Sequence, residues 1–309
     1  MSTLQRPISL IGLPYQFGRR DDGGGYRMAR GPEVLLAEDA VPRALREAGS
    51  AAAELRWLDH LDDAAPWTGE GPPLSPGDQM VRQLVQNRGL AEAVRQEKSR
   101  GHLPVSIAGG CNSSLGVVAG LDDPELGLMW FDAHADAETP ETSTDGLFEG
   151  MPVSIIAGLS WKRWRENIPG FRVIPTSRIV QIGLHDQSFY DKLPGERRGL
   201  GTIVGPDEVG TDGFETAFSG ALSGLAEQTG RIYVHIDTDV VDARIVRANK
   251  HAAEGGPTPD DLIWAVSRIA ERAKIEAVSF SSFDTSVDPN AANVLVPMIT
   301  RIVQIAARS

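Results

Sequence analysis

The sequence predicts an α/β fold with a mostly parallel sheet of about eight strands, covered by helices on both faces. Short runs rich in Val, Ile and Leu recur along the chain, and continuous apolar runs are typical of strands that are buried on both faces. The stretches between these runs leave room for a helix, which a parallel connection requires. Several of the runs end in acidic residues, at the edge where an open parallel sheet places its ligand site.

Eight apolar runs are strand candidates. In order along the chain they are Ile8–Leu13, Glu54–Leu58, Val105–Gly109, Leu126–Asp132, Arg178–Leu184, Gly201–Gly205, Arg231–Asp237 and Glu276–Phe283. Stretches with helical periodicity lie between most of them, including Gln79–Arg100 and Phe214–Gln228, and Asn293–Arg308 follows the last strand. This alternation predicts strand, helix, strand connections through most of the chain.

The segment Thr258–Asp261 (TPDD) predicts the start of another helix, which we expect to continue to Lys274. Threonine is a favourable N-cap, proline fits the first helical position, and an acid at the third helical position completes a capping box. The Pro- and Gly-rich segment Asp62–Pro76 lies between a strand and a helix, so we interpret it as a surface loop. We therefore expect residues 1–309 to form one domain.

The composition excludes several classes of partner. With 30 Lys+Arg against 42 Asp+Glu the formal charge is −12, and such a surface repels nucleic acid and anionic membranes. We find no secretion signal and no apolar run of about 18 residues, so we expect a cytoplasmic protein that acts on a small molecule. The single cysteine, Cys111, excludes an internal disulfide and a zinc site built of thiolates, so any metal would be held mainly by oxygen and nitrogen ligands.

Two strand ends carry potential metal ligands at alternate positions. Asp132, His134 and Asp136 follow the fourth strand, and Asp237 and Asp239 follow the seventh. Residues two apart in an extended chain project to the same side, so each segment can direct its ligands toward one point.

Either motif alone is more typical of a turn or a helix cap than of a metal site. Together they place four carboxylates close to one another, and each carboxylate then raises the pKa of its neighbours unless cations lie between them. A pair of divalent metal ions is the simplest explanation. Oxygen ligands with one imidazole favour Mn²⁺ over Zn²⁺, so we expect one or two Mn²⁺ per chain.

The motifs DAHAD with the following TPETSTDG, HIDTDVVDA, and GGCNSS at Gly109–Ser114 resemble those of the arginase/agmatinase (ureohydrolase) family. The resemblance covers most of the chain. It implies a three-layer α/β/α domain, hydrolysis of guanidine-type C–N bonds at a binuclear manganese centre, and assembly into trimers or hexamers.

The resemblance also implies the metal ligands. Five of the six family positions are filled by Asp132, His134, Asp136, Asp237 and Asp239, with Asp132 and Asp237 as bridging ligands. The sixth position is a histidine in the family and Asn112 here, and Cys111 replaces the aspartate before it. An amide is a poorer donor than imidazole, so we expect weaker binding there. Cys111 is either a thiol beside the metal or a small buried residue, which is the more common fate of a free cysteine.

The segment after DAHAD departs from the arginase pattern. Its polar residues include Glu138, Ser143, Asp145 and Glu149, and it lacks the histidine that transfers protons in arginases. Three acids would repel a substrate carboxylate, so free L-arginine is a poor candidate and a substrate with a cationic or neutral tail fits better. We expect Glu138, Ser143 and Asp145 to contact the substrate and Glu149 to serve as an acid/base group.

Two further positions bear on catalysis. Ser286 stands where the family has a glutamate that pairs with the guanidinium group, and Asp284 or Asp288 is a candidate replacement. By the same resemblance, Asp136 is placed to orient the nucleophile and to pass a proton to the leaving amine. His235 lies on the same side of its strand as Asp237, and we interpret it as a packing residue beneath the site, with contact to the metals as the alternative.

Three hypotheses follow from the sequence. The leading one is a ureohydrolase-like metallohydrolase that acts on linear amidines, the guanidino or amidino small molecules. The second is an amidase or deacetylase-like hydrolase with a single metal ion. The third is a catalytically silent protein of the arginase fold, because Asn112 and Ser286 replace the family's histidine and glutamate and the histidine that transfers protons is missing.

Overall fold

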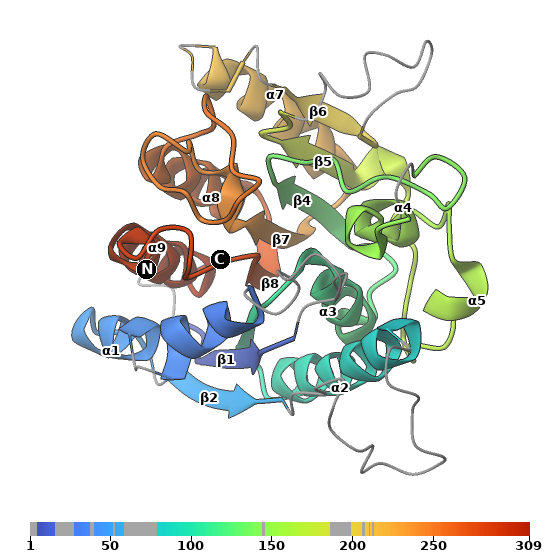
Figure 1. The fold of residues 1–309 in the computed structure, drawn as a ribbon, viewed down its shortest axis with the longest axis horizontal. Helices are drawn as coiled ribbons and strands as arrows, with labels where there is room; N and C mark the ends of the chain where they lie inside the picture. Colours follow the sequence, from blue (N-terminus) through green and yellow to red (C-terminus); the bar gives the residue numbers. More distant parts are fainter. Residues whose placement is uncertain are drawn as a thin grey trace.

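The computed structural model describes residues 5–15, 28–37, 40–51, 53–58, 79–143, 146–185, 199–205, 208–209, 211 and 213–309. The eight predicted strands all form, and they build one sheet in the order β2-β1-β3-β8-β7-β4-β5-β6 (Figure 1). Every pairing between neighbouring strands is parallel. The predicted loop at 62–76 lies outside the described residues.

The strand boundaries agree with the predicted ones to within a few residues. The strands are β1 Ile8–Leu13, β2 Ala53–Trp57, β3 Leu103–Ala108, β4 Gly127–Phe131, β5 Ile179–Ile182, β6 Thr202–Val204, β7 Arg231–Asp237 and β8 Lys274–Ser281. The largest difference is at β8, which begins two residues earlier and ends two residues earlier than predicted. It ends at Ser281 because Ser282 has a left-handed backbone (φ 65°) that cannot continue a strand.

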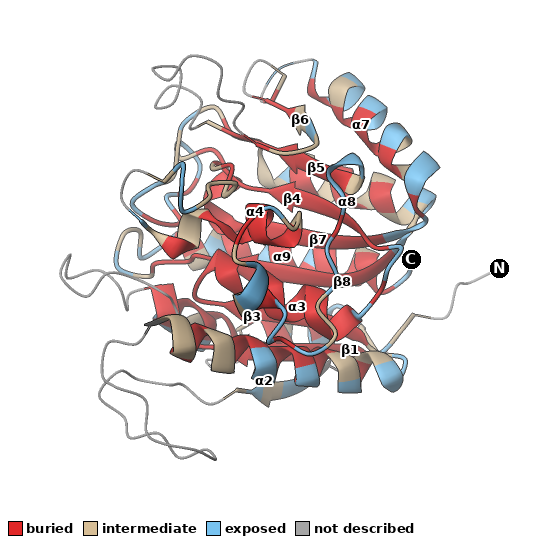
Figure 2. Ribbon diagram, turned by 90° about the vertical axis from the view of Figure 1, so that its right-hand side faces the viewer, coloured by how far each residue is buried: buried red, intermediate tan, exposed pale blue. Residues whose placement is uncertain are grey.

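Helices cover both faces of the sheet, which gives three layers (Figures 1 and 2). One face carries α1 Ala40–Glu47, α7 Phe214–Gln228, α8 Pro259–Arg272 and α9 Ala291–Ala306, and the other carries α2 Gln79–Ser99, α3 Ser114–Leu121 and α4 Pro152–Ile156. Each face has its own hydrophobic cluster, so the strands are buried on both sides as their apolar runs predict. None of the helices in the described part of the chain has the length and hydrophobicity needed to cross a bilayer.

The predicted capping box opens α8. The Thr258 side chain accepts a hydrogen bond from the Asp261 backbone N–H (3.1 Å), and the Thr258 backbone N–H donates to Asp261 Oδ2 (2.8 Å). The helix ends at Arg272, before Lys274, because Lys274 already pairs with Arg231 as the first residue of β8.

The centre of the sheet brings together strands that are distant in sequence. The neighbouring strands β3, β8, β7 and β4 are all parallel, so their carboxyl ends lie at one edge. The last strand, β8, lies between β3 and β7. The predicted ligand motifs follow β3, β4 and β7, so the topology alone places them side by side.

The amino end of β8, on the side of the sheet away from the ligand motifs, carries a buried carboxylate, Glu276, that should contribute to stability. Lys274 Nζ lies 2.9 Å from Glu276 Oε2 and Arg231 Nε lies 3.0 Å from Glu276 Oε1. Burial alone would raise the pKa of Glu276, but the two cations outweigh burial and hold this pKa below its ordinary value of 4.5. A carboxylate with a lowered folded-state pKa stabilises the fold above pH 4.5, and the contribution disappears as pH falls through the folded-state pKa.

We therefore expect Glu276→Gln to lower the free energy of unfolding at pH 7 by about 1–3 kcal/mol, because Lys274 loses its counter-charge and Arg231 is left with Asp123 (3.1 Å). Urea unfolding of both proteins at pH 7 and at pH 3 measures this, and the difference should shrink at pH 3. Glu92→Gln is the matched control, since Glu92 forms an exposed pair with Arg95 that should contribute little. A difference that persists unchanged at pH 3 would contradict the electrostatic explanation.

Candidate metal centre

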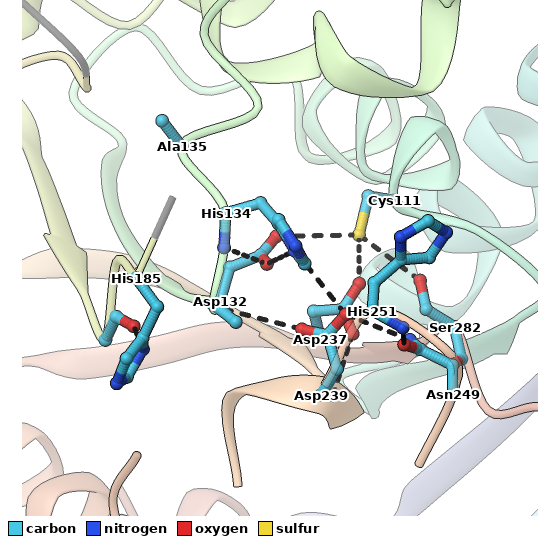
Figure 3. A network of polar contacts seen from close by, with 12 residues as sticks. Cys111, Asp132, His134, Ala135, His185, Asp237, Asp239, Asn249, His251 and Ser282 are labelled. Carbon is cyan, nitrogen blue, oxygen red and sulfur yellow. Dashed lines mark hydrogen bonds and ion pairs between the residues drawn. The ribbon is translucent and has the colours of Figure 1, made fainter. Parts of the chain in front are cut away.

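Two groups of potential ligands meet at the carboxyl edge of the central strands (Figure 3). One contains Asp132, His134 and Asp239, and the other contains Cys111, Asp132 and Asp237. In each group the donor atoms lie within 4.8 Å of one another. Asp132 belongs to both groups, so the two potential metal positions adjoin.

The first group joins the ends of β4 and β7. His134 Nδ1 lies 3.3 Å from Asp132 Oδ1 and 3.5 Å from Asp239 Oδ2. Asp132 and Asp239 are buried, and backbone N–H groups hold them in place: His134 donates to Asp132 Oδ1 (2.8 Å) and Ala133 donates to Asp239 Oδ1 (3.4 Å). The backbone turn that follows β4 thus holds both carboxylates.

The second group contains the buried thiol of Cys111, on the short 3₁₀ turn Cys111–Ser113 that follows β3. Its Sγ donates to Asp237 Oδ2 at 2.9 Å and lies 3.9 Å from Asp132 Oδ2. The Trp130 indole N–H also donates to Asp132 Oδ2 (3.0 Å). Cys111 is therefore a buried residue, and its sulfur also lies among the candidate ligands.

The pKa values in the cluster show how unfavourable it is for the carboxylates to be ionised together. Burial raises the pKa of Asp132 to about 7 and, with the charges of Asp239 and Asp132, raises that of Asp237 well above its ordinary value. Burial alone would lower the pKa of His134, but Asp239 and Asp132 outweigh it and raise this pKa well above 6.5. A divalent cation among these groups would remove the repulsion.

Asn112, the predicted sixth ligand, is engaged with Glu149. Its Nδ2 donates to Glu149 Oε2 (2.9 Å) and its backbone N–H donates to Glu149 Oε1 (3.2 Å). The close approach depends on Gly110, where an added Cβ would lie 2.0 Å from Glu149 Oε1. Burial raises the pKa of Glu149 to about 7. Asn112 Oδ1 is buried, and within the described residues it has no hydrogen-bond partner.

Among the described residues, Asp136 belongs to neither of the two ligand groups that contain Asp132. Burial, with the charge of Asp132, raises its pKa well above the ordinary value, and the charges of Asp237 and Glu149 add to this shift. Its backbone is left-handed (φ 48°), and its carbonyl accepts a hydrogen bond from Val153 N–H (2.8 Å). The strand's alternation therefore ends before Asp136, and spacing alone did not determine where its side chain lies.

The predicted substrate residues are less closely grouped. The Glu138 carboxylate lies beside Gly150, where an added Cβ would be 3.4 Å from Glu138 Oε2. Ser143 Oγ accepts from Gly146 N–H (3.1 Å) in the turn of that loop. Asp284 is buried, and its Oδ1 accepts from the backbone and hydroxyl of Ser286 (2.9 and 2.6 Å).

Asp145, also predicted to contact substrate, lies outside the described residues. Asp284 Oδ1 is thus held by the backbone and side chain of Ser286.

Three contributors to the site had weak or no signals in the sequence. His235 Nε2 lies 3.3 Å from Cys111 Sγ, so the histidine beneath the site contacts the thiol. Asn249 donates to Asp239 Oδ2 (2.9 Å) and to the carbonyl of Ser282 (3.0 Å), and Ser282 Oγ lies 3.6 Å from Cys111 Sγ. Alternation along β7 indicated His235, but nothing in its local sequence indicates Asn249, which comes from the loop after β7.

The donor set fits a divalent cation. It offers the buried carboxylates of Asp132, Asp237 and Asp239, one imidazole and one thiol. Among the described residues, the buried Oδ1 of Asn112, next to Cys111, has no hydrogen-bond partner. Asp132, His134 and Asp239 supply only oxygen and nitrogen, the ligands that suit Mn²⁺.

Comparison with known proteins gives a consistent result. The family model described as "Arginase family" matches residues 6–303. The chain is 27% identical to an arginase of Bacillus caldovelox over 292 residues, which cover 92% of each protein. It is 32% identical to an arginase of Eremothecium gossypii over 195 residues, or 61% of this chain and about half (48%) of that relative.

Solved structures share the fold. The native arginase of Bacillus caldovelox superposes with a TM-score of 0.78 at 24% identity, covering 96% of this chain and 98% of that one. The agmatine ureohydrolase of Thermoplasma volcanium superposes with a TM-score of 0.64 at 14% identity, covering 98% of this chain and 94% of that one. On the match of nearly its whole length to the family model, the chain belongs to the arginase family.

Proposed function

We propose that the protein is a metal-dependent hydrolase that cleaves a C–N bond of a guanidino or amidino small molecule other than free L-arginine. The observation that carries this proposal is the convergence of Asp132, His134, Asp237 and Asp239 at the carboxyl edge of an arginase-family sheet. Asp132, His134 and Asp239 would hold Mn²⁺. The bound ion would supply Lewis-acid activation of water for attack on the guanidine or amidine carbon.

The residues around the ligands supply proton transfer in this proposal. Asp136 orients the nucleophile and passes a proton to the leaving amine, and Glu149 serves as an acid/base group. A general acid or base works best with a pKa near the working pH, and burial raises the pKa of Glu149 to about 7. The two hydrogen bonds from Asn112 fix the Glu149 carboxylate.

The acidic loop favours a substrate without a carboxylate. Glu149 adds to the negative potential of a site that already contains four aspartates, and Glu138 lies beside Gly150 in the same acidic loop. A substrate with a cationic or neutral tail avoids this repulsion, whereas the carboxylate of free L-arginine does not.

Urea release by the Mn²⁺-loaded full chain tests the function. We expect agmatine, which has an amine tail, to give a kcat/KM at least about tenfold above that of L-arginine, the ratio that about 1.4 kcal/mol of repulsion produces. L-arginine as the better substrate would contradict the predicted specificity. With metal bound, no urea from any guanidino compound and no ammonia from any amidino compound would contradict the C–N hydrolase itself.

One observation favours a second candidate, an amidase with one metal ion. Of the two ligand groups at the carboxyl edge of the central strands, the group with His134 has an imidazole and the group with Cys111 does not. Metal content separates the candidates: about two ions per chain support the binuclear hydrolase, and about one ion together with acetate release from N-acetylated amines supports the amidase.

A further inference from the structure

We propose that Cys111, rather than Asn112, is the ligand that the turn after β3 contributes to the second metal position, and that His235 is the positioning residue of its sulfur. This inference rests on the metal-dependent function proposed above. It assigns a thiolate, Asp132 and Asp237 to one position, which we call the sulfur position, beside the position formed by Asp132, His134 and Asp239.

The first argument is which side chain of the turn reaches the carboxylates. Cys111 Sγ lies 2.9 Å from Asp237 Oδ2, 3.9 Å from Asp132 Oδ2 and 3.1 Å from Ser281 Oγ, so it contacts groups from the ends of β7, β4 and β8. Asn112, the next residue, instead directs its amide nitrogen to Glu149. The turn therefore places the sulfur of Cys111 beside Asp132 and Asp237 (Figure 3).

The second argument is a series of buried hydrogen bonds that ends at Cys111 Sγ. His235 Nε2 lies 3.3 Å from Cys111 Sγ and its Nδ1 lies 2.7 Å from Ser279 Oγ, which in turn lies 2.5 Å from the hydroxyl of Tyr233. One consistent set of donors runs from Tyr233 to Ser279, from Ser279 to His235 Nδ1, and from His235 Nε2–H to the sulfur. All four residues are buried, so each bond forms away from water.

The register of the sheet fixes the position of the His235 ring beside the sulfur. Trp130 on β4, His235 on β7 and Ser279 on β8 are direct neighbours across the three strands. The Trp130 ring stacks on the imidazole with centroids 3.8 Å apart and planes at 18°. With one nitrogen facing Ser279 and the other facing the sulfur, the imidazole supports a ligand as an outer-shell partner.

The chemistry of the position follows from its donors. On metal binding, the bond between Sγ and its proton breaks, a sulfur–metal bond forms, and the proton that Cys111 shares with Asp237 Oδ2 passes to solvent. Thiolate is a soft ligand, so the sulfur position should prefer Zn²⁺ or Co²⁺ to Mn²⁺. The neighbouring position has only oxygen and nitrogen donors, so the two positions should differ in the metals that they favour.

X-ray absorption of the full chain, freed of metal by chelation and reloaded with Zn²⁺, tests the assignment directly. We expect a zinc–sulfur distance of about 2.3 Å. Loading with Co²⁺ should give the near-ultraviolet charge-transfer band of a thiolate–Co²⁺ bond. Zinc bound only through oxygen and nitrogen in the unmodified protein would overturn the sulfur ligand, whether or not any variant folds.

Two variants separate the neighbouring residues of the turn. Cys111→Ser should lose the sulfur signal and the cobalt band and should weaken the binding of one ion by at least about tenfold, whereas Asn112→Ala should keep both signals. The reverse pattern would overturn the assignment in favour of Asn112. A chain that takes up no divalent ion contradicts the metal-dependent function as well, so the two proposals fail in distinguishable ways.

His235 is tested through the spectrum rather than through activity. His235→Phe retains a ring against Trp130 but cannot donate to sulfur, so we expect the cobalt band to persist with a shifted energy and affinity at the sulfur position to fall about 10- to 100-fold. His235→Gln, whose amide can donate, should restore part of that affinity. An unchanged band and affinity in His235→Phe would overturn the positioning role.

Discussion

Asp132→Ala is expected to abolish tight binding of divalent metal and, with it, hydrolysis. Asp132 is the carboxylate that the group with His134 and the group with Cys111 share, so its loss removes a donor from each metal position at once. The loss of affinity should exceed the roughly 10- to 100-fold that removal of an outer-shell partner costs. Elemental analysis and calorimetric titration with Mn²⁺ measure the effect.

The matched control is Asp122→Asn, which also removes one negative charge. Asp122 pairs with Arg172 near the amino end of β4, away from the ligand groups, and its left-handed backbone (φ 44°) accepts asparagine. We expect metal content and urea release to be unchanged in this variant. If Asp132→Ala retained the metal content of the parent protein, the ligand assignment would be wrong.

Glu149→Gln is expected to lower kcat by about 100- to 10,000-fold while leaving metal content intact, because it removes an acid/base group but no proposed ligand. The kcat/KM of the parent protein should fall as pH drops through the pKa of Glu149, since the proposed role requires the carboxylate form. Burial sets this pKa at about 7, and a bound cation lowers it. We therefore expect the acidic limb of the profile of kcat/KM against pH at or below pH 7. The limb should disappear in Glu149→Gln.

Gly110→Ala tests the position of the same carboxylate without changing its chemistry. The Gly110 backbone is extended (φ −155°, ψ 163°), so alanine adds no backbone strain, but its Cβ would lie 2.0 Å from Glu149 Oε1 and must displace it. We expect a loss of kcat comparable to that of Glu149→Gln. Gly220→Ala is the control, because a Cβ at Gly220 in α7 would meet nothing within 4 Å. Full activity in Gly110→Ala would show that Glu149 is not required where it lies.

The sequence was sufficient to predict the strands because buried parallel strands have a distinct composition. All eight formed, and the capping box at Thr258 placed the start of α8 correctly. The end of β8 was predicted two residues too late, since the left-handed backbone of Ser282 follows from its tertiary contacts and not from its residue type. The order of the strands was likewise not readable from the local pattern, because long-range packing determines it.

The sequence predicted which strand ends carry the ligand motifs. Asp132 and His134 follow β4 and lie 3.3 Å apart, and Asp237 and Asp239 come together through the Asp239 N–H to Asp237 Oδ1 bond (2.9 Å). His134 and Asp239 reach these places through turns beyond the strands, which strand alternation does not describe. The turn at Gly109 and Gly110 decides whether Cys111 or Asn112 faces the acids, and glycine permits too many backbone conformations for spacing to settle this.

The central place of β8 has a consequence for how the protein is made. Until Lys274–Ser281 has left the ribosome, the strands already synthesised can form only two separate sheets, β2-β1-β3 and β7-β4-β5-β6, with β3 and β7 each presenting an open edge. Such edges are templates for aggregation. Assembly of the ligand group with Cys111, which draws on β3, β4 and β7, therefore waits for β8, whereas the group with His134 needs only the neighbouring strands β4 and β7. We expect this chain to depend on protection by chaperones until β8 is made.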